Sequence, residues 1–169
     1  MSDTKVYRAT LSLGKSTDTY DASGKILEEK EVGQISKAQV IDVLNSFLGK
    51  SKQKPPIYSA IKVNGKKLYE YARNGEEVEI KERDIEIMMI ELIDFSNNWD
   101  CFDVKCSKGT YIRSLCVDIA KKLGYPGHMS HLERRQAGRF LITDLYYFRT
   151  VRKWWLFFTF NRWRFVWLS

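Results

Sequence analysis

Apolar and polar residues alternate over residues 6–13, which predicts a strand with one buried face. The positions on the apolar side are Tyr7, Ala9, Leu11 and Leu13, and those on the polar side are Arg8, Thr10 and Ser12. Residues 17–24, T-D-T-Y-D-A-S-G, are rich in side chains that hydrogen-bond their own main chain. This segment therefore predicts an ordered turn that presents Asp18 and Asp21 and leads into a second strand near residues 25–30.

Helical spacing of apolar residues occurs in two segments. Ser36 and Gln39 form a capping box for the first helix, which Gly49 is expected to end. The second helix is expected to stop at Gly124 in the left-handed conformation. The apolar positions are Val40, Ile41, Val43, Leu44, Phe47 and Leu48 in the first helix, and Ile112, Leu115, Cys116, Ile119 and Leu123 in the second.

Turn signals separate several short elements in the rest of the chain. Residues 50–56, K-S-K-Q-K-P-P, predict a basic loop kinked by two prolines, and Asn64-Gly65 is the strongest hairpin signal in the sequence. Strands that outnumber helices and arrive in hairpins predict an α+β domain, with helices packed against a mixed, largely antiparallel sheet. The remaining expected elements are a short helix over residues 68–73, strands near residues 85–95 and 101–106, and a turn at Gly138 and Phe140 into a last strand.

The composition narrows the class of partner. The chain has 169 residues, enough for one domain with a substantial core, and a formal net charge of +7. This charge favours a polyanionic partner, and nucleic acid and an anionic membrane surface both remain open. Three cysteines without a C-x-x-C pair disfavour a disulfide scaffold and a zinc site, and favour reduced thiols in the cytoplasm. The first residues contain no apolar h-region, so no signal peptide is expected.

Residues 149–169 form a tail of a different kind. The tail holds four of the five tryptophans, several arginines and no acidic residue. Aromatic and basic residues of this kind partition to membrane headgroups, although charges interrupt the segment too often for it to span a bilayer. Because neither helical nor strand periodicity is sustained, the favoured interpretation is a non-native tail, such as a read-through or out-of-frame end. The domain itself is expected over residues 1–148.

Candidate chemistry gathers in residues 106–113, C-S-K-G-T-Y-I-R. A basic glycine loop directly precedes Tyr111 and Arg113 at the start of the second long helix. The free N–H groups of a helix start favour anions, and Lys108 adds a positive charge, so the segment can hold a phosphate, stack on a base and orient an acid. The alternative is an ordinary βα turn with a solvated Arg113 and a Tyr111 in the core. This segment alone does not decide between them.

Five motifs follow one another along the chain: K-V-Y-R-A, L-G-K-S-T-D-T-Y-D-A-S-G, P-P-I-Y-S-A-I-K-V-N-G-K-K-L-Y-E-Y-A-R-N-G, C-S-K-G-T-Y-I-R-S-L and H-M-S-H-L-E-R-R-Q-A-G-R-F. From about residue 5 to residue 144, this series closely resembles the tRNA pseudouridine synthase B family. The resemblance implies a pseudouridine synthase fold, a cleft for a flipped-out uridine, and isomerisation of uridine in the tRNA T-arm, at position 55, to pseudouridine. It also implies a cytoplasmic monomer that needs no cofactor and no metal.

The resemblance implies roles for single residues as well. Tyr7 is expected to stack on the uracil and assist proton transfer, while Tyr111 and Leu132 line its pocket. Arg113 is expected to pair with the catalytic aspartate, because a nearby cation keeps a carboxylate ionised, and Asp21 is expected to support the site. The residues expected to contact RNA phosphates are Lys62, Lys66, Lys67, Arg73 and Lys108. Taken singly, each of these lysines is a solvated surface charge, Tyr7 is a packed strand aromatic and Leu132 is core.

One feature of the family is not found in this sequence. The family's nucleophilic aspartate lies in a G-x-L-D-P-type motif upstream of K-V-Y, and no such motif occurs here. Asp18, Asp21 and Asp118 are not convincing substitutes. We therefore expect an N-terminally truncated family member that is inactive as this chain alone, with a catalytically inactive RNA-binding fragment as the alternative. A membrane-surface protein that acts through the tail is a third hypothesis.

Overall fold

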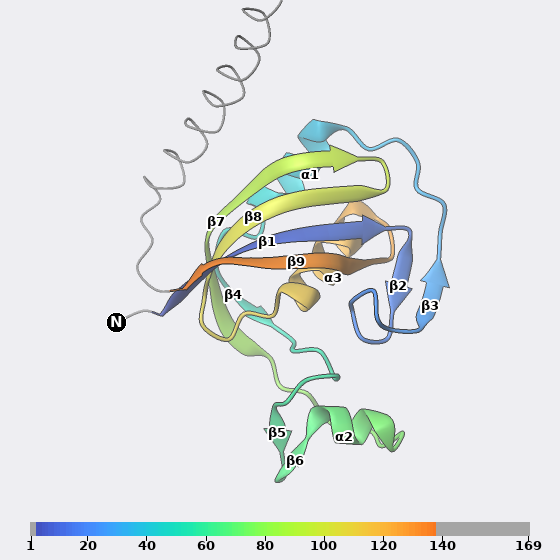
Figure 1. The fold of residues 1–169 in the computed structure, drawn as a ribbon, viewed down its shortest axis with the longest axis vertical. Coiled ribbons are helices and arrows are strands. Elements are labelled where there is room, and N and C mark those ends of the chain that lie inside the picture. Colours follow the sequence, from blue (N-terminus) through green and yellow to red (C-terminus); the bar gives the residue numbers. More distant parts are fainter. Residues whose placement is uncertain (1–2, 138–169) are drawn as a thin grey trace, which may run out of the picture. The chain divides into compact units, whose positions relative to one another are not determined.

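The computed structural model describes residues 3–137, and Figure 1 shows their arrangement. Strands predominate in this part of the chain, in agreement with the predicted α+β class. The elements in chain order are β1 (Thr4–Leu13), β2 (Lys15–Thr17), β3 (Ile26–Glu29), α1 (Lys37–Asn45), β4 (Gly49–Gln53), β5 (Lys62–Val63), β6 (Lys66–Lys67), α2 (Leu68–Arg73), β7 (Arg83–Ser96), β8 (Trp99–Ser107), α3 (Ile112–Leu123) and β9 (Gly127–Ala137).

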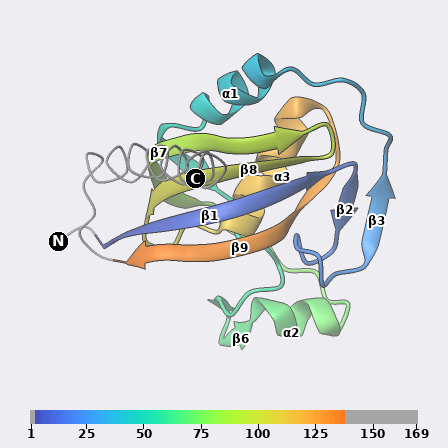
Figure 2. The same ribbon diagram turned by 45° about the horizontal axis from the view of Figure 1, so that its top comes forward.

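The main sheet has five strands in the order β4-β7-β8-β1-β9, and every neighbouring pair is antiparallel. Strands β2 and β3 form a small second sheet, and β5 and β6 form a third. Helix α3 packs against β9 and β1, whereas α1 packs against β7 and α3 (Figure 2). The hydrophobic core therefore lies between the sheet and its two longer helices.

Strand β1 confirms the predicted alternation from Tyr7 to Leu13. Ala9 and Leu11 are fully buried, and the half-buried Tyr7 packs against the same core cluster. On the other side of the strand, Arg8 forms a two-pronged ion pair with its cross-strand partner Asp103, with nitrogen to oxygen distances of 2.7 and 2.9 Å. Because direct cross-strand partners share a face of the sheet, Arg8 and Asp103 lie on the side opposite Tyr7 and Ala9. Val6, two residues before Arg8, is 1% exposed, so burial does not follow the predicted alternation at the start of the strand.

A close approach between α3 and β9 depends on Gly127. A Cβ atom at this position would lie 2.5 Å from the Cβ of Ala120 and 3.0 Å from the main-chain oxygen of Ser12. Those distances are shorter than ordinary van der Waals contact, so any larger residue would push the helix off the strand. Gly127 therefore sets the distance between the C-terminal half of α3 and the sheet.

Local signals fixed several elements correctly. The capping box of Ser36 and Gln39 opens α1 as predicted. Asn64 and Gly65 have φ values of 51° and 79° and turn β5 into β6, which confirms the hairpin. Gly124 ends α3 with a φ of 92°, also as predicted. The short helix α2 and the hairpin of β7 and β8 are confirmed too, although both strands are longer than expected.

Two predictions between α1 and β5 are wrong. Helix α1 ends at Asn45 and not at Gly49, because Ser46 closes its last turn through hydrogen bonds to Asp42 and Val43. Phe47 and Leu48 therefore lie outside the helix. The expected basic loop is in part the edge strand β4, paired with β7. Its polar sequence shows no alternation, since only its last residue is buried.

The segment expected to turn into a last strand is itself a strand. Strand β9 pairs with β1 over its whole length, with two register shifts. Gly138 and Phe140 lie outside the described residues, as does the whole tail of residues 149–169. Within residues 3–137, no helix is long and apolar enough to cross a membrane.

Candidate functional site

Arg113, in the first turn of α3, joins three segments that are distant in sequence. Its guanidinium donates a 2.9 Å hydrogen bond to the main-chain oxygen of Thr19 and another of 2.9 Å to that of Tyr58. The alternative of a solvated Arg113 is therefore wrong. Two fixed acceptors hold the planar guanidinium in one orientation, with its other N–H groups available for an anion.

The turn of residues 17–24 places Asp21 near this guanidinium. One oxygen of Asp21 accepts hydrogen bonds from the Thr19 hydroxyl and from the hydroxyl and main-chain N–H of Ser23. Burial raises the pKa of Asp21, whereas these hydrogen bonds and the charge of Arg113 lower it by a larger amount. The net shift of the pKa is therefore downward. The carboxylate is ionised at neutral pH and is held in place by its own turn.

The same turn is attached to β9. Main-chain hydrogen bonds run from Met129 to Tyr20 at 2.8 Å and from Ala22 to Met129 at 3.1 Å, on either side of Asp21. Tyr20 adopts a φ of 67°, which is uncommon for a residue other than glycine. Asp18 stays within the turn, where it accepts a hydrogen bond from the main chain of Lys25.

Tyr7 and Leu132 lie on adjacent strands. In the register of β1 and β9, Tyr7 is opposite Arg134 and Ala9 is opposite Leu132, so the two side chains share the face that α3 covers. Leu132 is 39% exposed, and its interpretation as core is wrong. Burial raises the pKa of Tyr7, with a further increase from Cys106 and a decrease from Arg134, and its phenol is protonated at neutral pH.

Tyr111 caps the start of α3 and is held by a residue that sequence reasoning missed. Its main-chain N–H donates to the side-chain oxygen of Gln53 at 2.9 Å, and its carbonyl accepts from the side-chain nitrogen of Gln53 at 3.0 Å. Tyr111 is half-buried and does not belong to the described core cluster. The only sequence signal for Gln53 was its place two residues before the Pro55-Pro56 pair.

The cationic residues of β5, β6 and α2 differ in whether they form an ion pair with an acidic side chain. Lys66 is 2.7 Å from a carboxylate oxygen of Glu76, and this hydrogen bond lowers the pKa of Glu76. Lys67 and Arg73 instead both lie over the ring of Tyr69, at 5.4 and 5.1 Å from its centroid. Within residues 3–137, neither of these two cations has an acidic partner.

Two further predicted RNA contacts are exposed. Lys62 begins the hairpin of β5 and β6, and Lys108 lies in the turn between β8 and α3, next to Gly109 with a φ of 84°. Within the described part of the chain, no hydrogen bond or ion pair joins Lys108 to the hairpin of Lys62. The structure brings Asp21 close to Arg113 and places Tyr7 and Leu132 on one face of adjacent strands, while Lys108 lies in the turn that precedes α3.

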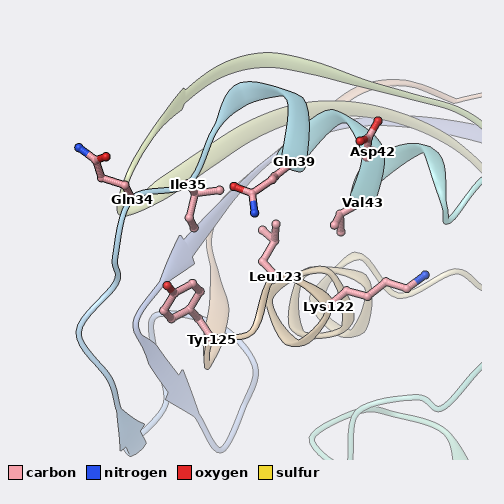
Figure 3. Close-up of a pocket in the computed structure, with 8 residues that line it drawn as sticks. All are labelled: Gln34, Ile35, Gln39, Asp42, Val43, Lys122, Leu123 and Tyr125. Atoms are coloured by element: carbon pink, nitrogen blue, oxygen red, sulfur yellow. The ribbon is translucent and has the colours of Figure 1, made fainter.

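A cavity of about 260 Å³ lies elsewhere, between α1 and the C-terminal end of α3 (Figure 3). Its lining mixes apolar and polar side chains. The cavity is lined by none of the residues predicted for the site. The lining residues are Gln34, Ile35, Gln39, Asp42, Val43, Lys122, Leu123 and Tyr125.

Comparisons with known proteins agree on one class. The family model described as TruB family pseudouridylate synthase (N terminal domain) matches residues 1–112. The chain is 55% identical over 144 residues to tRNA pseudouridine synthase B of Oceanobacillus iheyensis, covering 83% of this chain and 48% of that protein. It is 49% identical over 144 residues to tRNA pseudouridine synthase B of Clostridium tetani, covering 85% and 50%. The chain spans about half the length of these relatives.

Solved structures agree with this likeness. A Cbf5-Nop10-Gar1 complex matches with a TM-score of 0.55 and 27% identity, over 80% of this chain and 30% of that chain. An H/ACA RNP bound to a substrate RNA containing 2'-deoxyuridine matches with a TM-score of 0.51 and 23% identity, over 80% and 28%, which supports the fold alone. The fold and these likenesses place the chain in the pseudouridine synthase class of proteins. More narrowly, the chain belongs to the TruB family of pseudouridylate synthases.

Proposed function

We propose that this chain carries part of a site that isomerises uridine 55 in the T-arm of tRNA to pseudouridine. The observation that carries the proposal is the fixed guanidinium of Arg113, held between the main-chain oxygens of Thr19 and Tyr58 and close to Asp21. A cation fixed in this way is already oriented before a carboxylate binds to it, so little orientational entropy is lost on binding.

The reaction explains the residue types around this cation. The bond from C1′ to N1 breaks, the detached uracil turns, C5 bonds to C1′, and the proton that leaves C5 is balanced by one gained at N1. The base must leave its stack, which costs a few kcal/mol and is offset by stacking and edge contacts in the pocket. In this proposal Tyr7 stacks on the uracil, Tyr111 and Leu132 line the pocket, and Arg113 orients the catalytic carboxylate.

The chain by itself is proposed to bind RNA without turning it over. The family's nucleophile belongs to a G-x-L-D-P-type motif, which this sequence does not contain. Asp21 is engaged by its own turn through Thr19 and Ser23, which supports a positioning role and not attack on the sugar. The chain is further proposed to act in the cytoplasm as a monomer, without a metal or cofactor.

Phosphate contacts are proposed for Lys62, Lys67, Arg73 and Lys108, and to a smaller extent for Lys66. The support is the pair of cations over Tyr69 without an acidic partner, contrasted with Lys66 and its ion pair with Glu76. A cation without a partner releases more counterions when it meets a phosphate, so it contributes more to affinity. This arrangement also favours the second candidate function, an RNA-binding fragment without catalysis.

Two measurements test these proposals. Incubation of the chain with a T-arm stem-loop, followed by nucleoside analysis, is expected to give no pseudouridine, and turnover would contradict the proposed inactivity. In fluorescence anisotropy, the chain is expected to bind the uridine RNA more tightly than the same RNA with an abasic residue at that position. Tyr7→Ala should remove this preference and Tyr7→Phe should keep it. Equal binding of both RNAs by the unmodified chain would contradict the uridine pocket and leave the RNA-binding fragment as the remaining candidate function.

A further inference from the structure

Gln53 lies where the edge of the sheet meets the start of α3. It is the last residue of β4 and the only buried one of that strand, at 4% exposure. Its side-chain amide makes both of its hydrogen bonds to one residue, accepting from the main-chain N–H of Tyr111 at 2.9 Å and donating to the Tyr111 carbonyl at 3.0 Å. The side chain of Gln53 thus pairs with Tyr111 as the main chain of a neighbouring strand would. It fixes both the N–H and the carbonyl of Tyr111.

The residues after Gln53 continue the attachment to α3. The hydroxyl of Ser114 donates to the main-chain oxygen of Lys54 at 3.0 Å, and Arg113 donates to that of Tyr58. Ser114 is 3% exposed. Four hydrogen bonds thus tie residues 53–58 to the first turn of α3, where two of the proposed site residues lie.

The same segment is bound at its far end to the first turn of α2. The main-chain N–H of Tyr69 donates to the oxygen of Ser59 at 3.1 Å, and that of Leu68 donates to the oxygen of Ile61 at 2.8 Å. Leu68 is fully buried. Residues 53–61 therefore form one continuous hydrogen-bonded tether from Tyr111 to the residue that lies beneath Lys67 and Arg73.

We propose that Gln53 is a positioning residue for uridine recognition: it sets the position of Tyr111 in the pocket, while the hydrogen bonds of Ser114 and Arg113 hold the rest of the tether. Gln53 does not touch the base in this proposal. It acts through Tyr111, whose ring can contact a flipped uracil only if its main chain is fixed. The inference rests on the proposed function, since it assigns a role within the uridine pocket.

The test compares two side chains of matching length with a control glutamine. Gln53→Met keeps the shape and removes both hydrogen bonds, whereas Gln53→Glu keeps the acceptor and sets an oxygen against the Tyr111 carbonyl. Gln39→Met removes a capping glutamine of similar hydrogen-bonding capacity at a site remote from Tyr111. Circular dichroism of each full-length variant establishes whether it is folded. If Gln53→Met is unfolded, the binding test is carried out with Gln53→Glu.

The readout is the ratio of dissociation constants for an abasic and a uridine T-arm stem-loop. Both Gln53 variants are expected to lower this ratio by about tenfold, the effect of losing roughly one to two well-formed hydrogen bonds. The slope of log affinity against log salt and the affinity for the abasic RNA should stay unchanged, as should all values for Gln39→Met. A general loss of structure would instead weaken the binding of both RNAs together.

Each other outcome is decisive. If the unmodified chain prefers uridine and both Gln53 variants keep the full preference, the inference is wrong while the proposed function stands. If the unmodified chain shows no preference for uridine, the proposed function fails and the role of Gln53 fails with it. Amide exchange provides a separate check on the geometry, because the Tyr111 N–H should lose protection in Gln53→Met and keep it in Gln39→Met.

Discussion

The guanidinium of Arg113 donates a hydrogen bond to the main-chain oxygen of Tyr58, a residue 55 positions earlier in the chain. With its second bond to Thr19, 94 positions away, it connects the start of α3 to the turn of residues 17–24 and to the segment that follows β4. The arginine is therefore a structural cross-link as well as a candidate partner for a catalytic carboxylate.

Replacing Arg113 by lysine should reduce the stability of the domain. An ammonium is a single point of charge and cannot place two donors on two separated carbonyls as the guanidinium fork does. We expect a loss of about 1 to 3 kcal/mol in the free energy of unfolding, measured from urea titrations followed by circular dichroism. Arg135→Lys on β9, whose only described partner is the nearby Glu133, should change stability by less than about 0.5 kcal/mol. Equal values for the two variants would contradict the cross-link.

Gly24→Ala should disturb the turn that holds Asp21. The added Cβ would collide with the side chains of Thr19 and Asp18, both of which belong to the turn's hydrogen-bond network. Overpacking of this kind costs about 1 to 3 kcal/mol. Thermal unfolding of the variant should show the loss, and Gly33→Ala, where the nearest atom is the Tyr125 hydroxyl at 3.2 Å, should show a smaller one. Similar melting temperatures for both variants would count against a rigid turn.

Short-range signals account for the parts of the fold that the sequence predicted. The turn at Asn64-Gly65, the capping box at Ser36 and the stop at Gly124 each depend on neighbouring residues only. Strand β4 could not be found in the same way, because its pairing with β7 is a main-chain contact between residues 30 or more positions apart. Polar side chains along such an edge carry no periodicity that would reveal it.

The candidate site also has a part that the sequence predicted and a part that depends on contacts between distant residues. The order of motifs brought Tyr7, Asp21 and Arg113 forward as chemically relevant residues, and the structure places Asp21 close to Arg113. The acceptors of Arg113 and the pairing of Gln53 with Tyr111 were not predictable, since each joins residues 55 or more positions apart. A sequence pattern identifies which side chains carry chemistry, but tertiary packing decides what holds them.

Removal of Lys67 should lower the salt dependence of RNA binding more than removal of the internal pair of Lys66 and Glu76. A phosphate contact contributes roughly 0.7 to 0.9 to the slope of log affinity against log salt, so Lys67→Ala should reduce the slope by about that amount. The matched control replaces both Lys66 and Glu76 by alanine, which preserves net charge and removes only a pair already satisfied. Anisotropy titrations at several salt concentrations measure both slopes. A larger decrease in the control would place the phosphate at Lys66 instead.

Asp100 is a buried acid without a described partner. It lies on β8 opposite Leu11 and Phe95, is 1% exposed, and neither of its carboxylate oxygens has a hydrogen-bond partner within the described part of the chain. Burial raises the pKa of Asp100 from 3.8 to about 6. The folded state therefore retains a proton that the unfolded chain releases near pH 4, and folding becomes less favourable as the pH rises between these values.

Asp100→Asn should remove this pH dependence. A difference of about two pKa units corresponds to roughly 3 kcal/mol, so the variant should gain up to about that much over the wild type between pH 4 and pH 8. The asparagine amide is itself buried without a described partner, which shifts the stability of the variant by the same amount at every pH. The test is therefore how the difference in unfolding free energy between variant and wild type changes with pH. Urea titrations at pH 4, 6 and 8 measure it. Asp94→Asn, at an exposed position on β7, serves as the control and should run parallel to the wild type. Parallel curves for Asp100→Asn as well would show that its carboxylate is ionised and solvated in the folded protein.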